Sequence, residues 1–337
     1  VVDDVFDKIE AYNYLIDQNS RNLGVFLQSD WEITSKTTLL AGIRTDKHNF
    51  VDNLIVSPRI SLLFKPDLNT QLRASWSTGF RAPQAFDADM HIAFAGGGIQ
   101  TISLADDLNE ERSQSISASV NWDKPTEKHI YGFTLEGFYT RLKNAFILEE
   151  TGTDASGNSL MEKRNGGLSN VYGATLEARA NYNRMFQVEG GLTLQKSLYE
   201  KAVAWSEELP GTTDYLRTPE IYGYYTLTLT PGNRFSASFS GVYTGSMLVP
   251  HYGLPGDAGT PEQDELFQSP DFMEMNLKLA YIFNASRLDS SIEIFGGIGN
   301  MLNQYQNDFD RGKNRDSNYI YGPAKPRTFF VGLRIFN

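Results

Sequence analysis

The chain has 337 residues, no cysteine, 40% hydrophobic residues and a formal net charge of −11 at pH 7. The negative charge argues against a nucleic-acid partner, because nucleic acids select basic surfaces, and the lack of cysteine excludes disulfides. No apolar run is long enough for a membrane-spanning helix. A mean hydropathy of −0.37 is nevertheless compatible with a membrane β-barrel, because alternating strands hide their hydrophobicity from such an average.

Short segments of alternating apolar and polar residues follow one another along the chain. In the clearest of them, residues 113–122, Ile116 and Trp122 lie on one face and serines lie on the other, as alternate residues of a strand do. A helix would need apolar residues three and four apart, and we find no such segment of useful length. In chain order, strands are predicted at residues 20–32, 36–48, 54–65, 69–79, 112–123, 130–149, 165–180, 184–198, 216–230, 234–248, 271–283, 290–303 and 324–336.

The predicted connections fall into two length classes that alternate strictly. Short connections lie around Thr34, Asp67, Pro125, Asn183, Pro231 and Ala285, and longer ones around His48, Phe94, Ala155, Leu209, Gly256 and Asn314. In an antiparallel meander every second connection lies at the same rim, so the short turns share one end and the long loops the other. Outer-membrane barrels have this polarity, with short turns in the periplasm and long loops outside.

Aromatic residues lie beside the short turns, where amphipathic rings would form an interfacial girdle; they are Trp31, Phe64, Trp122, Tyr182 and Phe283. The alternative is a soluble barrel or sandwich with its apolar faces inward. Such a fold needs neither loop lengths sorted by rim nor so many charges on the polar strand faces. The sequence therefore predicts an all-β fold, a transmembrane antiparallel β-barrel, with residues 1–337 forming part of one barrel domain.

We expect the first part of the barrel to be missing from this chain. No signal peptide opens the sequence, although a barrel in this membrane must be exported, and thirteen strands is an odd number where single-chain bacterial barrels are even. Residues 328–336 have the alternating bulk of a last strand, with Phe336 in the penultimate position. Two unpaired sheet edges would be costly in lipid, so a companion chain or missing segment is expected to cover them.

Acidic residues gather in the predicted external loops. Residues 251–270 carry no Lys or Arg and four acids, Asp257, Glu262, Asp264 and Glu265. Such charge is ordinarily a solvated surface. The functional alternatives are a surface for a partner and a divalent-cation site, because clustered oxygen ligands suit calcium. Apart from calcium on these external loops, no intrinsic cofactor is expected.

One stretch connects these observations to a known family. Gly79–Asp87 (GFRAPQAFD) resembles the FRAP segment of TonB-dependent outer-membrane receptors, which closes a strand and opens a long external loop. Residues 22–31 (NLGVFLQSDW), 42–48 (GIRTDKH) and 299–305 (GNMLNQY) resemble further phrases of that family, in family order. The continuation of the FRAP segment to His91 is most similar to receptors of Bacteroidetes.

This resemblance implies a 22-stranded barrel with an N-terminal plug, of which the chain would supply roughly the last thirteen strands. It implies the outer membrane of a Gram-negative bacterium and energised import: loops capture a scarce ligand, binding shifts the plug, and TonB pulls the plug through a segment absent here. The implied partners are the lipid bilayer, TonB, the part of the protein that carries the plug and first strands, the ligand, and a surface lipoprotein in some receptors.

Histidines of the predicted external loops are candidates for ligand contact, because histidine is the commonest metal ligand; they are His48, His91 and His251. Heme receptors of the family carry a ligating histidine after the FRAP segment, where His91 lies. Residues 105–109 (ADDLN), however, depart from the heme receptors' pattern. The alternative for His91 is a loop residue with local hydrogen bonds.

Phe80 and Arg81 of the FRAP segment are also candidates. Arg81 either meets an anionic chelate or the plug, or bonds loop carbonyls with its fork of donors; Pro83 favours the structural role, because proline shapes a loop entrance. Aromatic loop residues either form a stacking surface for a flat ligand or pack between loops: Trp205, Tyr215, Tyr252 and Phe267.

Three functions remain. The first is TonB-dependent import of a metal chelate, meaning a ferric siderophore, heme or cobalamin; acidic loops are easier to reconcile with cobalamin and calcium than with a strongly anionic siderophore. The second is import of glycans or peptides by the same machinery, distinguished by full chain length and a lipoprotein lid. The third is a passive porin, against which the family phrases weigh. An enzyme is the least supported, because no phosphate loop, nucleophile elbow or paired-His zinc motif is present.

Overall fold

A computed structural model describes residues 1–9, 14–83, 100–153, 159–206, 209–253, 261–285, 290–311, 316 and 319–336. Every regular element in these ranges is a β-strand. Within them, no helix is long and apolar enough to cross a membrane. The strands are β1 (Val2–Ile9), β2 (Tyr14–Thr34), β3 (Thr37–His48), β4 (Ile55–Phe64), β5 (Thr70–Arg81), β6 (Gln100–Leu104), β7 (Glu111–Pro125), β8 (His129–Lys143), β9 (Phe146–Thr153), β10 (Ser159–Asn165), β11 (Ser169–Tyr182), β12 (Phe186–Val203), β13 (Thr212–Asp214), β14 (Ile221–Leu229), β15 (Phe235–Thr244), β16 (Leu248–His251), β17 (Glu265–Gln268), β18 (Phe272–Ala285), β19 (Ser290–Gly299) and β20 (Thr328–Phe336).

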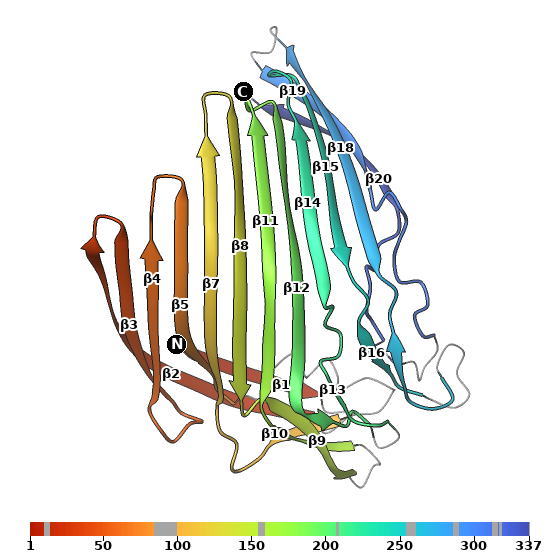
Figure 1. Ribbon diagram of the computed structural model, residues 1–337. Helices are drawn as coiled ribbons and strands as arrows, with labels where there is room; N and C mark the ends of the chain where they lie inside the picture. Colours follow the sequence, from red (N-terminus) through yellow and green to blue (C-terminus); the bar gives the residue numbers. More distant parts are fainter. Residues whose placement is uncertain are drawn as a thin grey trace.

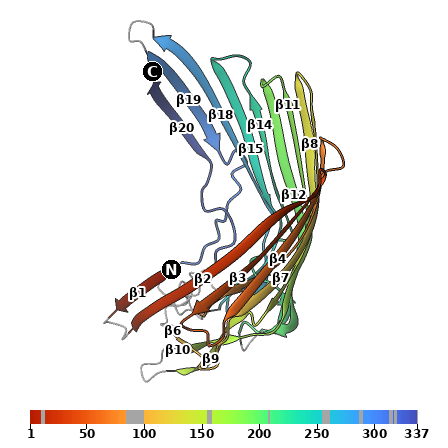
Figure 2. The ribbon, with the colours of Figure 1, turned by 90° about the vertical axis from the view of Figure 1, so that its left-hand side faces the viewer.

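The long strands form one antiparallel sheet in which successive long strands are also neighbours in space (Figure 1). In the described residues this sheet has 15 strands, in the order β1-β2-β3-β4-β5-β7-β8-β11-β12-β14-β15-β18-β19-β20, with β13 paired to β12. It curves strongly without closing, and its two edge strands, β1 and β20, lie on the same side of Figure 2. The predicted antiparallel barrel architecture is confirmed, whereas the total of twenty-two strands stays a prediction.

Two strands of this sheet are additional to the thirteen expected. β1 (VDDVFDKI) lacks clean alternation, yet it pairs along its whole length with β2; β13 is three residues long. The single strand expected over 130–149 is wrong. β8 ends at Lys143 because Asn144 takes a φ of 57°, in the left-handed region that interrupts a strand, and β9 then pairs with β10 in a separate sheet.

The ends of further strands also differ from expectation. β11 begins at Ser169 rather than at 165, β12 ends at Val203 rather than at 198, and β15 and β19 end at Thr244 and Gly299 rather than at 248 and 303. β14 begins at Ile221 rather than at residue 216, and β20 begins at Thr328 rather than at 324. Pro219 and Pro326 lie just before these starts and cannot donate a ladder hydrogen bond. β2 reaches back to Tyr14, because β1 gives its first residues a partner.

Connections are sorted by rim as predicted. β2, β4, β7, β11, β14 and β18 end at the upper end of the sheet in Figure 1, and β3, β5, β8, β12 and β15 run toward the lower end. The lower end also carries a three-stranded sheet, β6-β10-β9, and the β16–β17 hairpin. Of the aromatic residues predicted for a girdle beside the short turns, those exposed are Trp31, Phe64, Tyr182 and Phe283. Trp122 is half-buried and contacts the Phe133 ring at 5.9 Å.

Cross-strand register sorts the side chains into an apolar and a polar face. Leu135 of β8 lies opposite Leu176 of β11, whereas the next residue, Glu136, lies opposite Thr175. The side chains of Leu135 and Leu176 are 46% and 49% exposed. A continuous apolar face of this kind is unfavourable in water and is the lipid-facing band of a membrane barrel, so the polar face lines the lumen.

Hydroxyl groups of adjacent strands bond to one another on the polar face. The oxygen-to-oxygen distances are 2.8 Å for Ser61–Ser75, 2.9 Å for Ser115–Thr140 and 2.9 Å for Thr175–Thr193. Toward the short-turn end, Arg179 donates to both carboxylate oxygens of Asp123 and to Asn121. At these positions the wall satisfies its own polar groups.

Candidate ligand-binding site at the loop end

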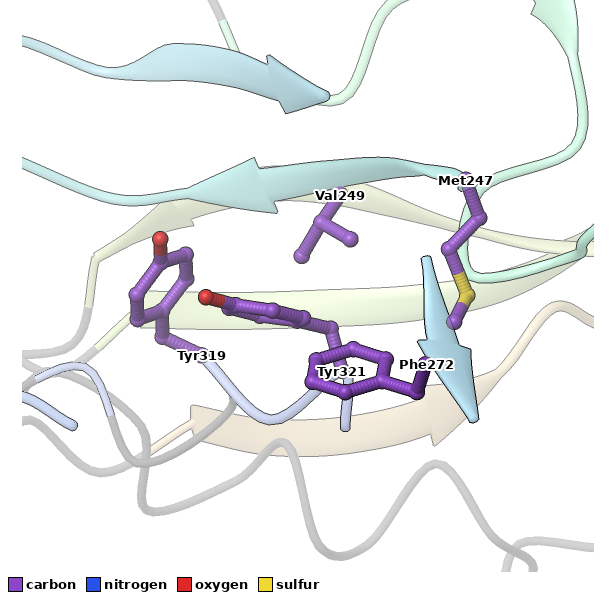
Figure 3. Close-up of a cluster of buried hydrophobic side chains, with 5 residues drawn as sticks. All are labelled: Met247, Val249, Phe272, Tyr319 and Tyr321. Atoms are coloured by element: carbon purple, nitrogen blue, oxygen red, sulfur yellow. The ribbon is translucent and has the colours of Figure 1, made fainter. Parts of the chain in front are cut away.

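The connection between β19 and β20, residues 300–327, has no strand in its described residues, yet it packs against the β16–β17 hairpin. Buried side chains from the two connections and from the first residue of β18 form a cluster (Figure 3): Met247, Val249, Phe272, Tyr319 and Tyr321. Phe267 packs against this cluster from β17. Because apolar burial is the main source of favourable folding energy, this cluster holds two long loops together at the mouth of the barrel.

Buried polar groups fix the backbone of the β19–β20 connection. The Gln306 side chain is 1% exposed; it donates to the Tyr319 carbonyl at 2.8 Å and accepts the Tyr321 amide at 2.9 Å. Asn300 donates to the carbonyls of Gln304 and Lys325, both at 2.9 Å. These side chains replace the missing strand ladder, as buried backbone groups require.

His251, one of the predicted candidates, lies at the centre of this contact. Its ring stacks on the Tyr319 ring with centroids 3.6 Å apart and planes 9° apart. Its Nε2 lies 3.0 Å from a carboxylate oxygen of buried Asp310, and its Nδ1 lies 3.5 Å from Glu265. Asp310 also accepts the Asp316 amide at 3.0 Å. His251 is therefore held on both ring nitrogens and on one face.

The two tyrosines of the cluster share one acceptor. The hydroxyls of Tyr319 and Tyr321 donate to the same Asp308 oxygen at 3.3 Å and 2.6 Å. Burial, followed by the negative charge of Asp308, raises the pKa of Tyr319 to about 12. Burial and the hydrogen bond to Asp308 also raise the pKa of Tyr321. Both phenols therefore stay protonated through the physiological range.

A second aromatic group lies next to this one. Tyr199 of β12 and Tyr215 stack with ring centroids 4.2 Å apart and planes 8° apart, and Trp205 lies 6.3 Å from Tyr199. Tyr215 donates to Ser169 at 2.7 Å on the polar face of the sheet. The indole N–H of Trp205 is shielded from solvent and has no acceptor among the described residues. An unpaired buried donor is uncommon and is the kind of group that a ligand oxygen would satisfy.

Tyr252 connects the two groups. Its hydroxyl donates to the Trp205 carbonyl at 3.3 Å, and its backbone amide donates to Asp316 at 3.1 Å. The structure thus brings together four predicted candidates, Trp205, Tyr215, His251 and Tyr252, from two loops. One of the four, Tyr215, also lines a cavity of about 440 Å³, together with the Lys196–Glu220 ion pair and the start of β16 among others.

The two FRAP-segment candidates point to opposite sides of the wall. Arg81 pairs with Glu111 at 3.5 Å and lies over the Phe146 ring at 5.2 Å; Glu111 also accepts the Phe146 amide at 2.6 Å. These contacts, with a carboxylate and a ring, fasten the start of β9 to the barrel, and bonding of Arg81 to loop carbonyls stays a prediction. Phe80 is in register with Arg112 on the apolar face, so its contact with a ligand stays a prediction.

The remaining candidates are dispersed. Glu262 is exposed, Asp264 accepts the Gly253 amide at 2.8 Å, and Glu265 faces His251. Within the described ranges no three His, Cys, Asp or Glu side chains are grouped as metal ligands. Asp257 and His91 lie outside the described residues, so calcium on these loops stays a prediction. His48 is buried and its Nδ1 accepts the Phe50 amide at 3.2 Å.

Sequence reasoning did not single out several residues of this site, namely Tyr199, Asp308, Asp310, Tyr319 and Tyr321. Their contacts join positions far apart in the chain, for example 59 residues between His251 and Asp310. The available signal was local composition. The connection after β19 is rich in tyrosine, asparagine and aspartate, residue types that form hydrogen-bonded loops.

Comparison with known proteins gives one family and a set of similar structures. The model of the family described as TonB dependent receptor-like, beta-barrel, matches residues 2–329. The siderophore receptor PirA from Acinetobacter baumannii is similar with a TM-score of 0.68 and 14% identity over 95% of this chain and 46% of that one. The ferric-catecholate import receptor Fiu from Escherichia coli is similar with a TM-score of 0.66 and 15% identity over 96% of this chain and 46% of that one.

PirA from Pseudomonas aeruginosa gives a TM-score of 0.64 and 14% identity over 95% of this chain and 49% of that one. The chain therefore spans about half the length of these structures. At these identities the likeness concerns the fold alone. No curated protein matches the chain.

Proposed function

Because the chain belongs to the TonB-dependent receptor family, as its β-barrel domain, we propose that it supplies barrel wall and external ligand-capturing loops to a receptor that imports a scarce metal chelate. Membership places it in the outer membrane of a Gram-negative bacterium, among transporters rather than enzymes. Import itself, its energising by TonB and a surface lipoprotein partner are proposals, because the chain spans about half of its structural neighbours.

The family match over residues 2–329 carries this proposal. The geometry of the loop end supports it. A receptor that captures a ligand needs ordered contact groups at the external mouth of its lumen. Here aromatic faces and the shielded indole N–H of Trp205 lie on polar-face and loop positions at the long-loop rim. The hydroxyl groups of the wall described above, in contrast, already bond to one another.

For the ligand, we favour a ferric siderophore. Several neighbours are described as siderophore or ferric-catecholate receptors, and planar, oxygen-rich chelates match both stacking faces and an N–H donor. Heme and cobalamin remain alternatives within the same class of metal chelate. An importer of glycans or peptides and a passive porin are the outcomes that would contradict the proposal.

The test is an uptake assay with the full-length receptor in a strain that lacks its own iron-chelate receptors. Cells are supplied with radioactive iron as a panel of ferric siderophores or as hemin, or with radiolabelled cobalamin, with and without a functional tonB gene. We expect TonB-dependent accumulation of one chelate. Accumulation that is equal without TonB would indicate a passive pore, and no accumulation of any chelate would overturn the proposed ligand class.

A pair of tryptophan substitutions locates the ligand. Trp205→Phe keeps an aromatic ring and removes the N–H, and we expect chelate affinity to fall by up to about tenfold, the range of one hydrogen bond. Trp31→Phe, at the short-turn rim of the apolar face, is the matched control and should leave affinity unchanged. Equal affinities for both variants would remove Trp205 from the binding site while leaving import by this receptor intact.

A further inference from the structure

The apolar face of the sheet changes character at its long-loop end, between β7 and β12. Through the middle of the band it carries residues such as Val120, Leu135 and Leu176, which are in register with one another. Toward the long loops come Tyr139 and Tyr172, which lie opposite each other across β8 and β11 and are 42% and 43% exposed. Tyrosines at this height mark the boundary between hydrocarbon and headgroups.

Beyond the tyrosines, the same face carries cations. Arg141 of β8 lies two residues past Tyr139 and is in register with Gln114 and Asn170. Lys143 lies two residues further and is directly opposite Arg112 of β7. Alternate residues of a strand share a face, so these three cations face outward rather than into the lumen.

In the described part of the chain, one of the three cations of this rim patch, which are Arg112, Arg141 and Lys143, has an ion-pair partner. Arg112 pairs with Glu110 at 2.7 Å. Arg141 and Lys143 have no ion-pair partner among the described residues, and the Nε–H of Arg141 is shielded from solvent without an acceptor. Like charges directly opposite each other across two strands are destabilising, so the Arg112–Lys143 pair calls for an additional anion.

The surroundings indicate which anion. The patch lies at the external border of a lipid-facing band, just above two tyrosines, so a molecule bound there has its apolar part against the band and its negative part against the cations. The amides of Gln114 and Asn170 add polar groups at the same height, and Asn170 accepts the Tyr139 hydroxyl at 2.7 Å. A phosphorylated lipid of the outer leaflet has this division into acyl chains and anionic headgroup, and basic side chains at a membrane surface attract such headgroups.

We propose that the rim patch is a binding site for the phosphate groups of an outer-leaflet glycolipid. Arginine forms paired hydrogen bonds with phosphate, so Arg141 contributes the directional contact, and its shielded Nε–H gains an acceptor. Lys143 contributes charge from the end of its strand. The site lies on the outside of the wall, separate from the loop-end site proposed for the chelate.

The test measures binding of lipid A to the purified full-length receptor by native mass spectrometry, with diphosphoryl lipid A and with the same lipid stripped of its phosphates. We expect the phosphorylated form to bind and Arg141→Gln/Lys143→Gln to weaken its binding about thirtyfold, from about 1 kcal/mol for each cation. The charge-conserving variant Arg141→Lys/Lys143→Arg keeps both charges and loses the paired hydrogen bonds of Arg141, so it should bind more weakly than the unsubstituted protein and more tightly than Arg141→Gln/Lys143→Gln. Lys124→Gln, on the same face at the opposite rim, should have no effect.

Equal binding of the phosphate-free lipid, or unchanged binding by Arg141→Gln/Lys143→Gln, would overturn the proposal. Each variant is first checked for a folded barrel by its heat-modifiable migration in gels, and Arg141→Gln alone replaces the double variant if the latter does not fold. Capture of an acidic protein in place of the lipid would also overturn it. Chelate uptake is a separate readout, so failure of this proposal leaves the import proposal standing.

Discussion

His251 and Asp310 lie 59 residues apart in the chain and are joined by a hydrogen bond of 3.0 Å. Both side chains are almost wholly inaccessible to solvent. The bond fastens the connection between β19 and β20 to the end of β16, where the same imidazole stacks on Tyr319. Two long loops at the mouth of the barrel are therefore one folded unit.

Asp310→Asn should loosen this unit. Asparagine has no charge and a single acceptor oxygen, whereas both carboxylate oxygens of Asp310 lie within 3.1 Å of His251 Nε2 and one of them also accepts the Asp316 amide. We therefore expect a loss of about 2 kcal/mol of local stability, as for a hydrogen bond to a charged group. Hydrogen exchange of peptides covering 247–251 and 319–321 measures it and should quicken. His129→Gln, whose ring lies at the opposite rim beside Tyr131 and Tyr182, is the control. Unchanged exchange in Asp310→Asn would show that the hydrophobic cluster alone holds the loops.

The assignment of the two faces predicts opposite outcomes for adjacent residues. Leu135→Arg places a charge in the lipid-facing band and should cost about 2–4 kcal/mol of barrel stability. Glu136→Arg changes a side chain of the polar face, and the barrel should lose less than about 1 kcal/mol, as for most surface substitutions. Urea unfolding of the full-length receptor in lipid, followed by gel migration, compares them. Glu136→Arg being as costly as Leu135→Arg would contradict the register.

Alkaline pH should weaken the loop unit through Tyr319. Its pKa is raised from 10 to about 12, so the protonated phenol stabilises the fold; this contribution is complete below pH 10 and is lost as the pH rises through about 12. Tyr319→Phe removes the titrating group. The melting temperature of the variant should therefore fall less between pH 10 and 12 than that of the unsubstituted protein, although it starts lower. If the melting temperatures of the variant and of the unsubstituted protein fell equally between pH 10 and 12, Tyr319 would not have this role.

The Arg179 contacts near the short turns should give a modest stability effect. Arg179 donates to Asp123 at 2.6 Å and 2.9 Å, but the two side chains are 37% and 36% exposed, so water screens part of the attraction. We expect Arg179→Gln to cost about 1 kcal/mol in urea unfolding. Arg73→Gln is the control, because Arg73 lies on the same face without a hydrogen bond among the described residues. If Arg179→Gln and Arg73→Gln lowered the free energy of unfolding equally, the Arg179–Asp123 ion pair would contribute nothing measurable to stability.

Periodicity predicted the wall well and the loops poorly, for a physical reason. Alternation in β7 or β11 is local, because each residue's face follows from its neighbours, and the aromatic residues at the short turns add a second local signal. β1 escaped detection because Asp3, Asp4 and Asp7 interrupt its alternation, and only pairing with β2 reveals it.

The loop-end site required contacts that no window of sequence contains. Trp205, Tyr215, His251 and Tyr252 were predicted individually from residue type, while their common partners on the β19–β20 connection were not. Glu265, predicted as a calcium ligand, lies beside His251. The parallel pairing of β6 with β10 likewise joins segments separated by two strands of the wall.

The hydroxyl pairs between neighbouring strands have one further consequence. In Ser61–Ser75, Ser115–Thr140 and Thr175–Thr193 either oxygen can be the donor, because a hydroxyl rotates to suit its partner. A water molecule or a passing solute can therefore take one half of a pair while the other half turns toward it. The inner wall can therefore exchange a hydroxyl–hydroxyl bond for a hydroxyl–water bond by rotation of the hydroxyl alone, with the backbone hydrogen bonds of the sheet unchanged.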